Sequence, residues 1–207
     1  MINHVAFNIF GIEIRWYGIL MSAAIFIATL ISNKRADKYG MKKDLIFDLF
    51  LYVVPAAIIG ARVYYVIFEW KQYINNPLEI FNYRAGGLAI HGALIFGFIS
   101  GYIFAKKNNI NPLKLSDIVA PTIALGQAIG RWGNFINMEA HGGPTNLPWG
   151  IVINGQKVHP TFLYESLWDL GIFIFIILYM DKRKKFDGQL IFIYGILYSI
   201  GRFFIEG

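Results

Sequence analysis

The sequence of 207 residues contains no cysteine. Disulfide bonds, a thiol nucleophile and thiolate metal sites are therefore excluded as contributions from this chain. Histidine is scarce as well, with four residues, and no pair of histidines stands with carboxylates at metal-ligand spacing on one predicted helix. The residues thus give no support for a metal site.

Charged residues are few. They make up 15% of the chain, whereas 56% is hydrophobic and the mean hydropathy is +0.48. Such a composition is typical of an integral membrane protein. The apolar residues are spread along the whole sequence, which predicts one membrane domain over residues 1–207 and not a soluble domain with an anchor. Residues 1–4 lack a basic region and a cleavage site, so we expect no removable signal peptide.

The positive charge has an uneven distribution. The net charge is +6 and the isoelectric point is near 9.4, but 12 of the 19 lysines and arginines fall in three short polar segments, residues 34–43, 106–114 and 182–185. Membrane topology and anionic lipid headgroups explain basic residues placed in this way. The pattern therefore argues against nucleic acid as a partner.

Six apolar segments predict an all-α, polytopic transmembrane helix bundle. The predicted spans are residues 16–31, 45–68, 88–105, 115–129, 161–180 and 189–205. The basic segments follow the first, third and fifth spans, with five, three and four cations against four in all the outer segments together. The positive-inside rule then places those segments in the cytoplasm and both termini outside. Glycine pairs 97/101 and 126/130 are candidate points of close helix approach.

Three arginines lie inside or at the ends of the apolar runs: Arg62, Arg131 and Arg202. A guanidinium in hydrocarbon costs about 2.5–3.5 kcal/mol on insertion scales, and such residues usually mark a pathway or an active site. Counted at 1.5 Å per residue from the cytoplasmic helix ends, Arg62 and Arg202 reach the outer leaflet, roughly 25 Å and 20 Å along their helices. Arg131 follows a span that also runs outward.

An arginine cluster at headgroup depth suits a phosphate better than a proton or an alkali cation, because the planar guanidinium binds phosphate oxygens in pairs. Residues 126–139 are the densest polar stretch, with one arginine, two asparagines and Glu139 among glycines. Two alternatives stay open. An arginine can be a snorkelling or structural partner of Glu139, Glu165 or Glu206. A small transporter of an anionic lipid or solute would also use buried cations.

Histidine is the usual general base near neutral pH, and His91 begins the third predicted span among glycines 86, 87 and 92. A histidine at such a position is either a base or a packing residue, and the residues alone favour neither. His159 precedes Pro160 at the start of the fifth span, where a structural role is favoured.

Six blocks of this sequence resemble the signature motifs of the prolipoprotein diacylglyceryl transferase family. They occur in the family's order and extend over nearly the whole chain. The blocks are residues 15–18 (RWYG), 60–62 (GAR), 86–92 (GGLAIHG), 130–139 (GRWGNFINME), 159–165 (HPTFLYE) and 198–206 (YSIGRFFIE).

The resemblance implies an enzyme of the bacterial cytoplasmic (inner) membrane with its active site toward the outer face. Such an enzyme moves the diacylglyceryl group of phosphatidylglycerol onto the lipobox cysteine of a preprolipoprotein, the first step of lipoprotein maturation. A thioether forms, glycerol 1-phosphate leaves, and no cofactor takes part. The missing cysteine agrees with this, because the substrate would supply the sulfur.

The resemblance also implies roles for particular residues. Arg131 and Arg202 match essential arginines that would bind the lipid phosphate and stabilise its departure, and His91 matches a suggested thiol-deprotonating base. The remaining matches would contact phosphatidylglycerol: Tyr17, Asn134, Glu139, Gly142, Arg62 and Glu206.

The sequence departs from the family pattern at two points. Met138, Ala140 and His141 replace more usual residues around Glu139, which we expect to alter the headgroup pocket. The family usually has seven spans, so the resemblance implies a chain that is shortened at its C-terminus.

Overall fold

The structure is a computed structural model, and it describes residues 4–42, 44–82, 86–153 and 155–206. The described residues form six α-helices: α1 (Trp16–Lys38), α2 (Leu45–Phe68), α3 (Ile90–Lys107), α4 (Pro112–Ile136), α5 (Thr161–Phe175) and α6 (Gln189–Glu206). Helix α5 continues as a π-helical segment, Ile176–Met180. Two antiparallel hairpins, β1–β2 (Val5–Ile9, Ile12–Arg15) and β3–β4 (Ile151–Ile153, Gln156–Val158), and two 3₁₀ segments, Trp70–Gln72 and Pro77–Phe81, complete the chain. The predicted all-α fold class is confirmed.

Three helical segments of the described chain are long and apolar enough to cross a membrane: Trp16–Lys38, Leu45–Phe68 and Thr161–Met180. Gln189–Ile205 is a shorter apolar helix. Large apolar side chains cover the outsides of the helices; Phe98, Phe203 and Phe204 are each more than 70% exposed. Exposed apolar surface of this extent suits lipid contact and not contact with water. The protein is a membrane protein.

Two predicted spans continue further as helices than expected. Helix α1 runs on to Lys38, so Arg35 lies on a helix rather than in a basic loop, and it is only 4% exposed. Its Nε donates to the Ile118 carbonyl at 3.0 Å and its Nη2 pairs with Asp181 at 3.1 Å, which compensates the buried charge. Helix α4 runs past Arg131 to Ile136.

The chain divides into two compact units, which are described separately. Unit 1 comprises Met1–Arg35 and Ser116–Gly207, and unit 2 comprises Ala36–Leu115. Unit 1 contains both hairpins, α5, α6 and most of α1 and α4. Unit 2 contains α2, α3 and the two 3₁₀ segments.

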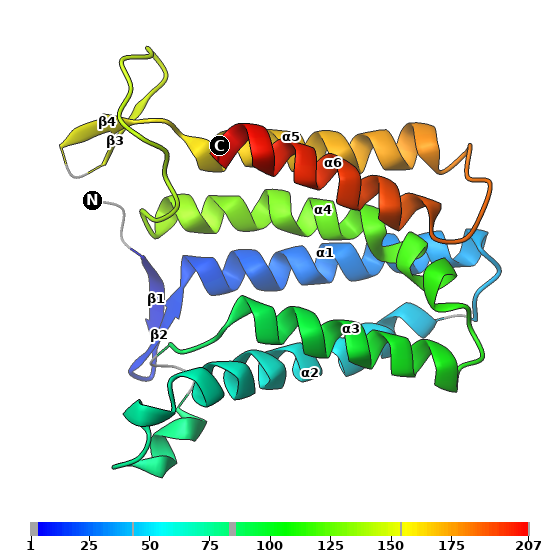
Figure 1. Cartoon of the computed structure of the whole chain (residues 1–207), viewed down its shortest axis with the longest axis horizontal. Coiled ribbons are helices and arrows are strands. Elements are labelled where there is room, and N and C mark those ends of the chain that lie inside the picture. Colours follow the sequence, from blue (N-terminus) through cyan, green and yellow to red (C-terminus); the bar gives the residue numbers. More distant parts are fainter. Residues whose placement is uncertain (1–3, 43, 83–85, 154, 207) are drawn as a thin grey trace. The chain divides into compact units, whose positions relative to one another are not determined.

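The four helices of unit 1 run side by side, and taken in the order α1, α4, α5, α6 they alternate in direction (Figure 1). Polar side chains join them in pairs. The Ser32 hydroxyl on α1 bonds to that of Thr122 on α4 at 2.7 Å, and the Tyr194 hydroxyl on α6 donates to Gln127 on α4 at 2.8 Å. Hydrogen bonds of this kind are a main source of helix association where lipid removes the hydrophobic driving force.

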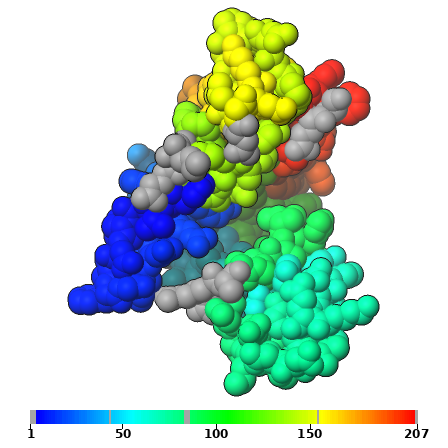
Figure 2. All heavy atoms as spheres, turned by 90° about the vertical axis from the view of Figure 1, so that its left-hand side faces the viewer, coloured from blue at the N-terminus to red at the C-terminus, as the bar shows by residue number. Residues whose placement is uncertain are grey.

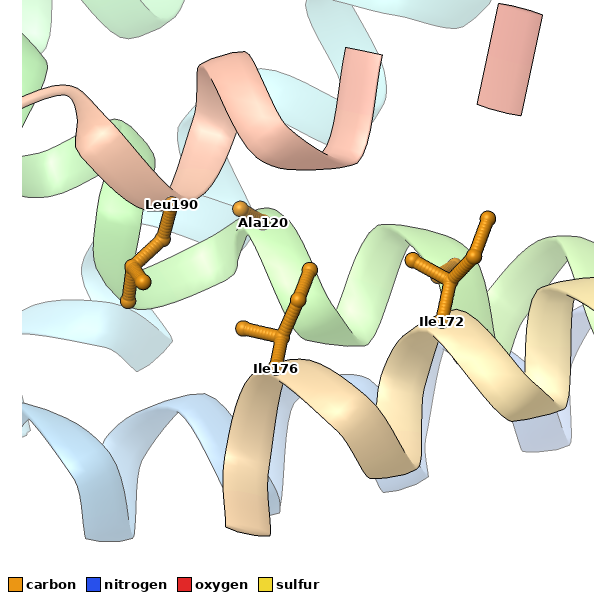
Figure 3. Packing of buried hydrophobic residues seen from close by; sticks show 5 residues of the cluster. Ala120, Ile172, Ile176 and Leu190 are labelled. Carbon is orange, nitrogen blue, oxygen red and sulfur yellow. The ribbon is translucent and has the colours of Figure 1, made fainter. Parts of the chain in front are cut away.

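A small apolar cluster lies between three helices of unit 1 (Figure 3). It consists of buried residues from α4, α5 with its π-helical continuation, and α6: Ala120, Ala124, Ile172, Ile176 and Leu190. Ile176 and Leu190 have no exposed surface. Small residues on α4 face large branched ones on the other two helices, so the three helices interdigitate closely.

One carboxylate, Asp117 on α4, ties the start of α6 to the bundle. It has no exposed surface, and it accepts hydrogen bonds from the backbone N–H groups of Gly188 (2.7 Å), Leu190 (2.8 Å) and Ile191 (3.0 Å). It thereby satisfies N–H groups that the first turn of α6 leaves without helical partners. Lys184 Nζ pairs with the same carboxylate at 2.9 Å. Burial lowers the pKa of Lys184, but the hydrogen bonds that Lys184 donates to Asp117 and Asp187 outweigh this effect and the pKa is raised.

In unit 2, α2 and α3 cross at two glycines. A Cβ built on Gly60 would lie 2.7 Å from the Gly92 carbonyl oxygen, and one built on Gly92 would overlap the backbone of Gly60. The helices can therefore approach this closely only without side chains at both positions. At the expected pair, Gly97 and Gly101, the contacts of an added Cβ are ordinary, at 3.8–3.9 Å.

Candidate functional site

The predicted site residues of unit 1 gather at one end of its helices. Tyr17 begins α1, Arg131 lies near the end of α4, and Arg202 lies near the end of α6. Because the helices alternate in direction, these positions reach the same end of the unit, where both hairpins also lie (Figure 1). Figure 2 faces that end, with the N-terminal hairpin in blue and the segment after α4 in yellow-green and yellow.

Arg131 and Arg202 meet at one carboxylate oxygen. Glu165 Oε2, on the first turns of α5, pairs with Arg131 Nη2 and with Arg202 Nη1, the latter at 2.5 Å. The Glu165 side chain is 4% exposed, whereas those of Arg131 and Arg202 are 17% and 30% exposed. The carboxylate is thus deep and the two cations lie on its more open side.

Neighbouring residues fix this convergence. Ser166, next to Glu165, donates to the Ala128 carbonyl on α4 at 2.8 Å and accepts from Trp132 Nε1 at 3.1 Å. These bonds hold α5 against the part of α4 that carries Arg131. On the other side, an added Cβ on Gly201 would overlap the Trp168 indole, whose Nε1 donates to the Leu197 carbonyl at 2.9 Å. The absence of a side chain at Gly201 therefore lets α6 bring Arg202 to Glu165.

A second buried carboxylate lies on the same face of α5. Asp169 follows Glu165 by four residues, which places the two side chains one above the other on the helix, and it is 2% exposed. Its Oδ2 has no hydrogen-bond partner among the described residues. It interacts electrostatically with Arg131, Glu165 and Arg202. Two cations and two carboxylates thus form one interacting group, in which both carboxylates are buried.

Tyr17 packs directly onto α4. A Cβ on Gly133 would overlap the Tyr17 ring, so the glycine of the sequence block at 130–139 accommodates this aromatic side chain. Tyr17 interacts electrostatically with both Glu139 and Arg131. The block at residues 15–18 and the block at 130–139 are therefore in contact in the structure.

The turn after α4 orients Glu139. Its Oε1 accepts hydrogen bonds from the side-chain amides of Asn134 and Asn137, each at 3.1 Å. Met138 and Ala140, on either side, adopt left-handed backbone conformations with φ of 55° and 53°. Non-glycine residues in this region cost on the order of 1–3 kcal/mol each and persist where the surroundings require them. The unusual residues noted in the sequence thus carry the strained backbone around Glu139.

Gly142 joins this turn to the segment before α5. Its N–H donates to the His159 carbonyl at 3.0 Å, and an added Cβ would lie 2.8 Å from the His159 Cβ and 2.9 Å from Thr161. His159 Nδ1 lies 3.4 Å from the Tyr164 hydroxyl. The structural role expected for His159 agrees with these contacts.

A cavity of about 440 Å³ opens beside Glu139. Its lining residues come from the N-terminal hairpin region and from the turn after α4: His4, Val5, Glu13, Arg15, Asn137 and Glu139. It holds charges of both signs and is open to solvent. Among the described residues, no group of three or more histidines, aspartates and glutamates is placed to hold a metal ion.

In unit 2, Arg62 is surrounded by backbone carbonyl oxygens. Its Nε donates to Ile80 (2.7 Å), Nη1 to Gly86 and Gly87 (2.9 Å each), and Nη2 to Glu79 (2.6 Å) and Asn82 (3.3 Å). A guanidinium has five N–H donors, so all of them are in use. Here Arg62 organises the segment between α2 and α3.

His91 is the second residue of α3 and is exposed. Its ring stacks on that of Tyr64 with centroids 6.0 Å apart, and the Ala89 N–H just before the helix donates to the Ala61 carbonyl at 3.1 Å. Glu206 ends α6, and its side chain lies outside the described part of the chain. Glu165 and Asp169 were not among the predicted site residues, although Glu165 was named as a possible ion-pair partner of an arginine. Their i, i+4 spacing on one span was the available signal.

Comparison with known proteins gives a consistent result. The family described as "Prolipoprotein diacylglyceryl transferase" matches residues 4–207. Three proteins named phosphatidylglycerol–prolipoprotein diacylglyceryl transferase are similar over nearly the whole chain. That of Clostridioides difficile (strain 630) is 57% identical over 205 residues, 99% of this chain and 82% of that protein. That of Finegoldia magna is 53% identical over 99% of this chain and 83% of that protein. That of Staphylococcus aureus (strain MSSA476) is 48% identical over 100% of this chain and 77% of that protein.

Proposed function

The chain belongs to the prolipoprotein diacylglyceryl transferase family, and we propose that it transfers the diacylglyceryl group of phosphatidylglycerol to the lipobox cysteine of preprolipoproteins. Its relatives carry this activity in their names. The observation that supports it in the structure is the convergence of Arg131 and Arg202 on one point at one end of unit 1. Two guanidiniums there supply charge and paired donors for a phosphodiester.

The reaction needs one bond to form and one to break. The substrate thiolate attacks the glyceryl carbon that carries the phosphate ester, and a carbon–sulfur bond forms. The bond between this carbon and the phosphate-ester oxygen breaks, and its electron pair leaves with glycerol 1-phosphate. Negative charge therefore grows on the phosphate in the transition state, where preorganised cations contribute most. Arg131 and Arg202 would bind the phosphate and stabilise that charge.

The roles proposed for the other predicted residues are supported to different degrees. Tyr17, Asn134, Glu139 and Gly142 surround or shape one turn near Arg131, which supports a part in binding the phosphatidylglycerol headgroup. His91 is the proposed base that removes the thiol proton, on the strength of the family resemblance. The predicted lipid contacts of Glu206 and Arg62 rest on the resemblance alone, and the saturated donors of Arg62 favour a positioning role instead.

We place the protein in the bacterial cytoplasmic membrane with the arginine end of unit 1 toward the outer face. The basic segment at residues 182–185 lies at the opposite end of the unit, and the positive-inside rule puts such segments in the cytoplasm. The substrate lipid and the lipobox peptide would then meet in the outer leaflet. The alternative, a transporter of an anionic lipid or solute, is not favoured by the comparisons.

The proposed activity has a direct test. Purified full-length chain is incubated with phosphatidylglycerol and a lipobox peptide, and mass spectrometry measures the increase expected for a diacylglyceryl thioether. A peptide with serine in place of the cysteine is the control, because its hydroxyl is a far weaker nucleophile than a thiolate. Arg131→Ala should abolish transfer while the protein still inserts into membranes. Absence of the thioether with the unaltered chain, or full transfer by the Arg131 variant, would contradict the proposal.

A further inference from the structure

The contact between Glu165 and the two arginines has a consequence for how the site takes a phosphate. The Oε2 atom of Glu165 accepts from Arg131 and from Arg202 together. An ionised carboxylate oxygen and a phosphate oxygen accept the same guanidinium N–H groups with the same geometry. Glu165 therefore occupies the position at which the proposed function requires a phosphate oxygen.

Both anions cannot bind the same donors at once. The Glu165 side chain is 4% exposed, and those of Arg131 and Arg202 are more exposed, at 17% and 30%. A phosphate that reaches the two guanidiniums meets one nitrogen of each that already contacts the carboxylate. Binding through those two nitrogens must therefore turn at least one arginine away from Glu165 or displace the carboxylate.

We propose that the Glu165 carboxylate occupies the phosphate site of Arg131 and Arg202 in the empty enzyme and is displaced when a phosphate binds. This inference rests on the proposed function. Without it, Arg131 and Arg202 would lose the carboxylate oxygen that both contact, and removing one member of a partly buried ion pair is costly. When the product phosphate is ready to leave, the carboxylate takes back the two guanidiniums. Glu165 thus weakens the binding of phosphate and speeds its release.

A purely structural ion pair between α4, α5 and α6 makes the opposite prediction. If Glu165 only holds the arginines in place, its removal disorders them and phosphate binds more weakly. If Glu165 competes with phosphate, its removal makes phosphate bind more tightly. The sign of the change in affinity therefore separates the two roles.

The experiment measures the affinity of glycerol 1-phosphate for the purified full-length chain by calorimetry in detergent, with glycerol as an uncharged control ligand. Glu165→Gln keeps the size of the side chain and removes its charge. We expect it to bind glycerol 1-phosphate about tenfold more tightly than the unaltered chain, which corresponds to about 1.4 kcal/mol. Glu165→Asp keeps the charge but is one methylene shorter and cannot hold both guanidiniums, so its affinity should rise by a smaller factor, about threefold.

Asp169→Asn is the matched control for charge. It removes a carboxylate one turn further along the same face of α5, and this carboxylate has no ion pair in the described contacts with either arginine. A gain equal to that of Glu165→Gln would mean that net charge, and not displacement, sets the affinity, and would overturn the proposal. Unchanged or weaker binding by Glu165→Gln would overturn it as well. If Glu165→Gln does not fold, the affinity of Glu165→Asp decides: tighter binding of glycerol 1-phosphate supports the proposal, and unchanged or weaker binding overturns it.

Steady-state kinetics give a second measurement. With phosphatidylglycerol and a lipobox peptide, Glu165→Gln should lower KM for the lipid and also lower kcat, because glycerol 1-phosphate leaves slowly. A raised KM would indicate a structural role. The unaltered chain is assayed in the same preparation. If it forms no thioether, the proposed function fails, whereas the role of Glu165 is judged by glycerol 1-phosphate binding alone.

Discussion

Gly201 lies where α6 packs against Trp168 of α5, and its replacement by alanine tests how the site is assembled. A Cβ at this position would overlap the Trp168 indole, and the Trp168 Nε1 bond to the Leu197 carbonyl, at 2.9 Å, would be disturbed as well. Gly195 on the same helix offers a control, because nothing lies within 4 Å of a Cβ added there. The two substitutions differ only in what the new methyl group meets.

The magnitude follows from three contributions. Alanine is favoured over glycine inside a helix by about 1 kcal/mol, and both variants gain this. At position 201, overpacking costs about 1–3 kcal/mol, and loss of the indole hydrogen bond costs about 0.5–1.5 kcal/mol. Gly201→Ala should therefore be destabilised by about 2 kcal/mol, whereas Gly195→Ala should be slightly stabilised. The gap of about 3 kcal/mol corresponds to about 6–12 °C in Tm for a chain of this size.

Activity should fall together with stability at position 201. Arg202 is the next residue, so a shift of α6 away from α5 moves its guanidinium from Glu165. A displacement of about 1 Å in a catalytic constellation can cost about 100-fold in rate. The assay is diacylglyceryl transfer below the Tm of both variants, alongside thermal unfolding in detergent. Equal stability and equal activity of the two alanine variants would refute the packing argument.

Three further predictions concern other parts of the chain. Asp117→Asn should destabilise the protein by about 3 kcal/mol, because its amide cannot accept all three backbone N–H bonds from the start of α6 and its pairing with Lys184 is lost at a position without exposed surface. Asp187→Asn changes a side chain that is 36% exposed and should lower the free energy of unfolding by less than about 1 kcal/mol. Equal losses of stability by the two variants in unfolding experiments would contradict the role assigned to Asp117. Arg62→Lys replaces five donors by three, so proteolysis between α2 and α3 should become faster. Unchanged protease resistance with lost transfer would instead support lipid contact by Arg62. His91→Gln should slow transfer, and the deficit should shrink as the pH approaches about 8.5, where a substrate thiol ionises unaided; a deficit independent of pH would make His91 a packing residue.

The helices could be predicted from the sequence because a long run of apolar residues is a strong local signal of a membrane-spanning helix. The end of α2 at Phe68 and the π-helical end of the fifth span at Met180 agree with the predicted bounds. The end of α1 differs from the predicted bound, because Lys34 and Arg35 are charged residues of a kind typical of a solvated loop. Carbonyls of α4 and the carboxylate of Asp181 compensate Arg35, and no sequence pattern on α1 reports such distant partners.

The site was predicted in part. The placement of Arg131 and Arg202 at one end followed from loop charges and helix length, and the structure brings both to Glu165. Glu165 itself was considered only as an alternative ion-pair partner, because a single sequence does not show which of three nearby glutamates an arginine meets. Close helix approach was expected at the glycine pairs 97/101 and 126/130 but occurs at Gly60 and Gly92, since i, i+4 spacing does not reveal which face of a helix meets its neighbour.

The capping of α6 by Asp117 limits the order in which the chain can enter the membrane. The ribosome makes Asp117 well before its partner Gly188, which is 71 residues later in the sequence. Until that backbone arrives, the first turns of α4 carry a carboxylate that lacks these three N–H partners. Helix α4 therefore reaches its final contacts only after the start of α6 has been made.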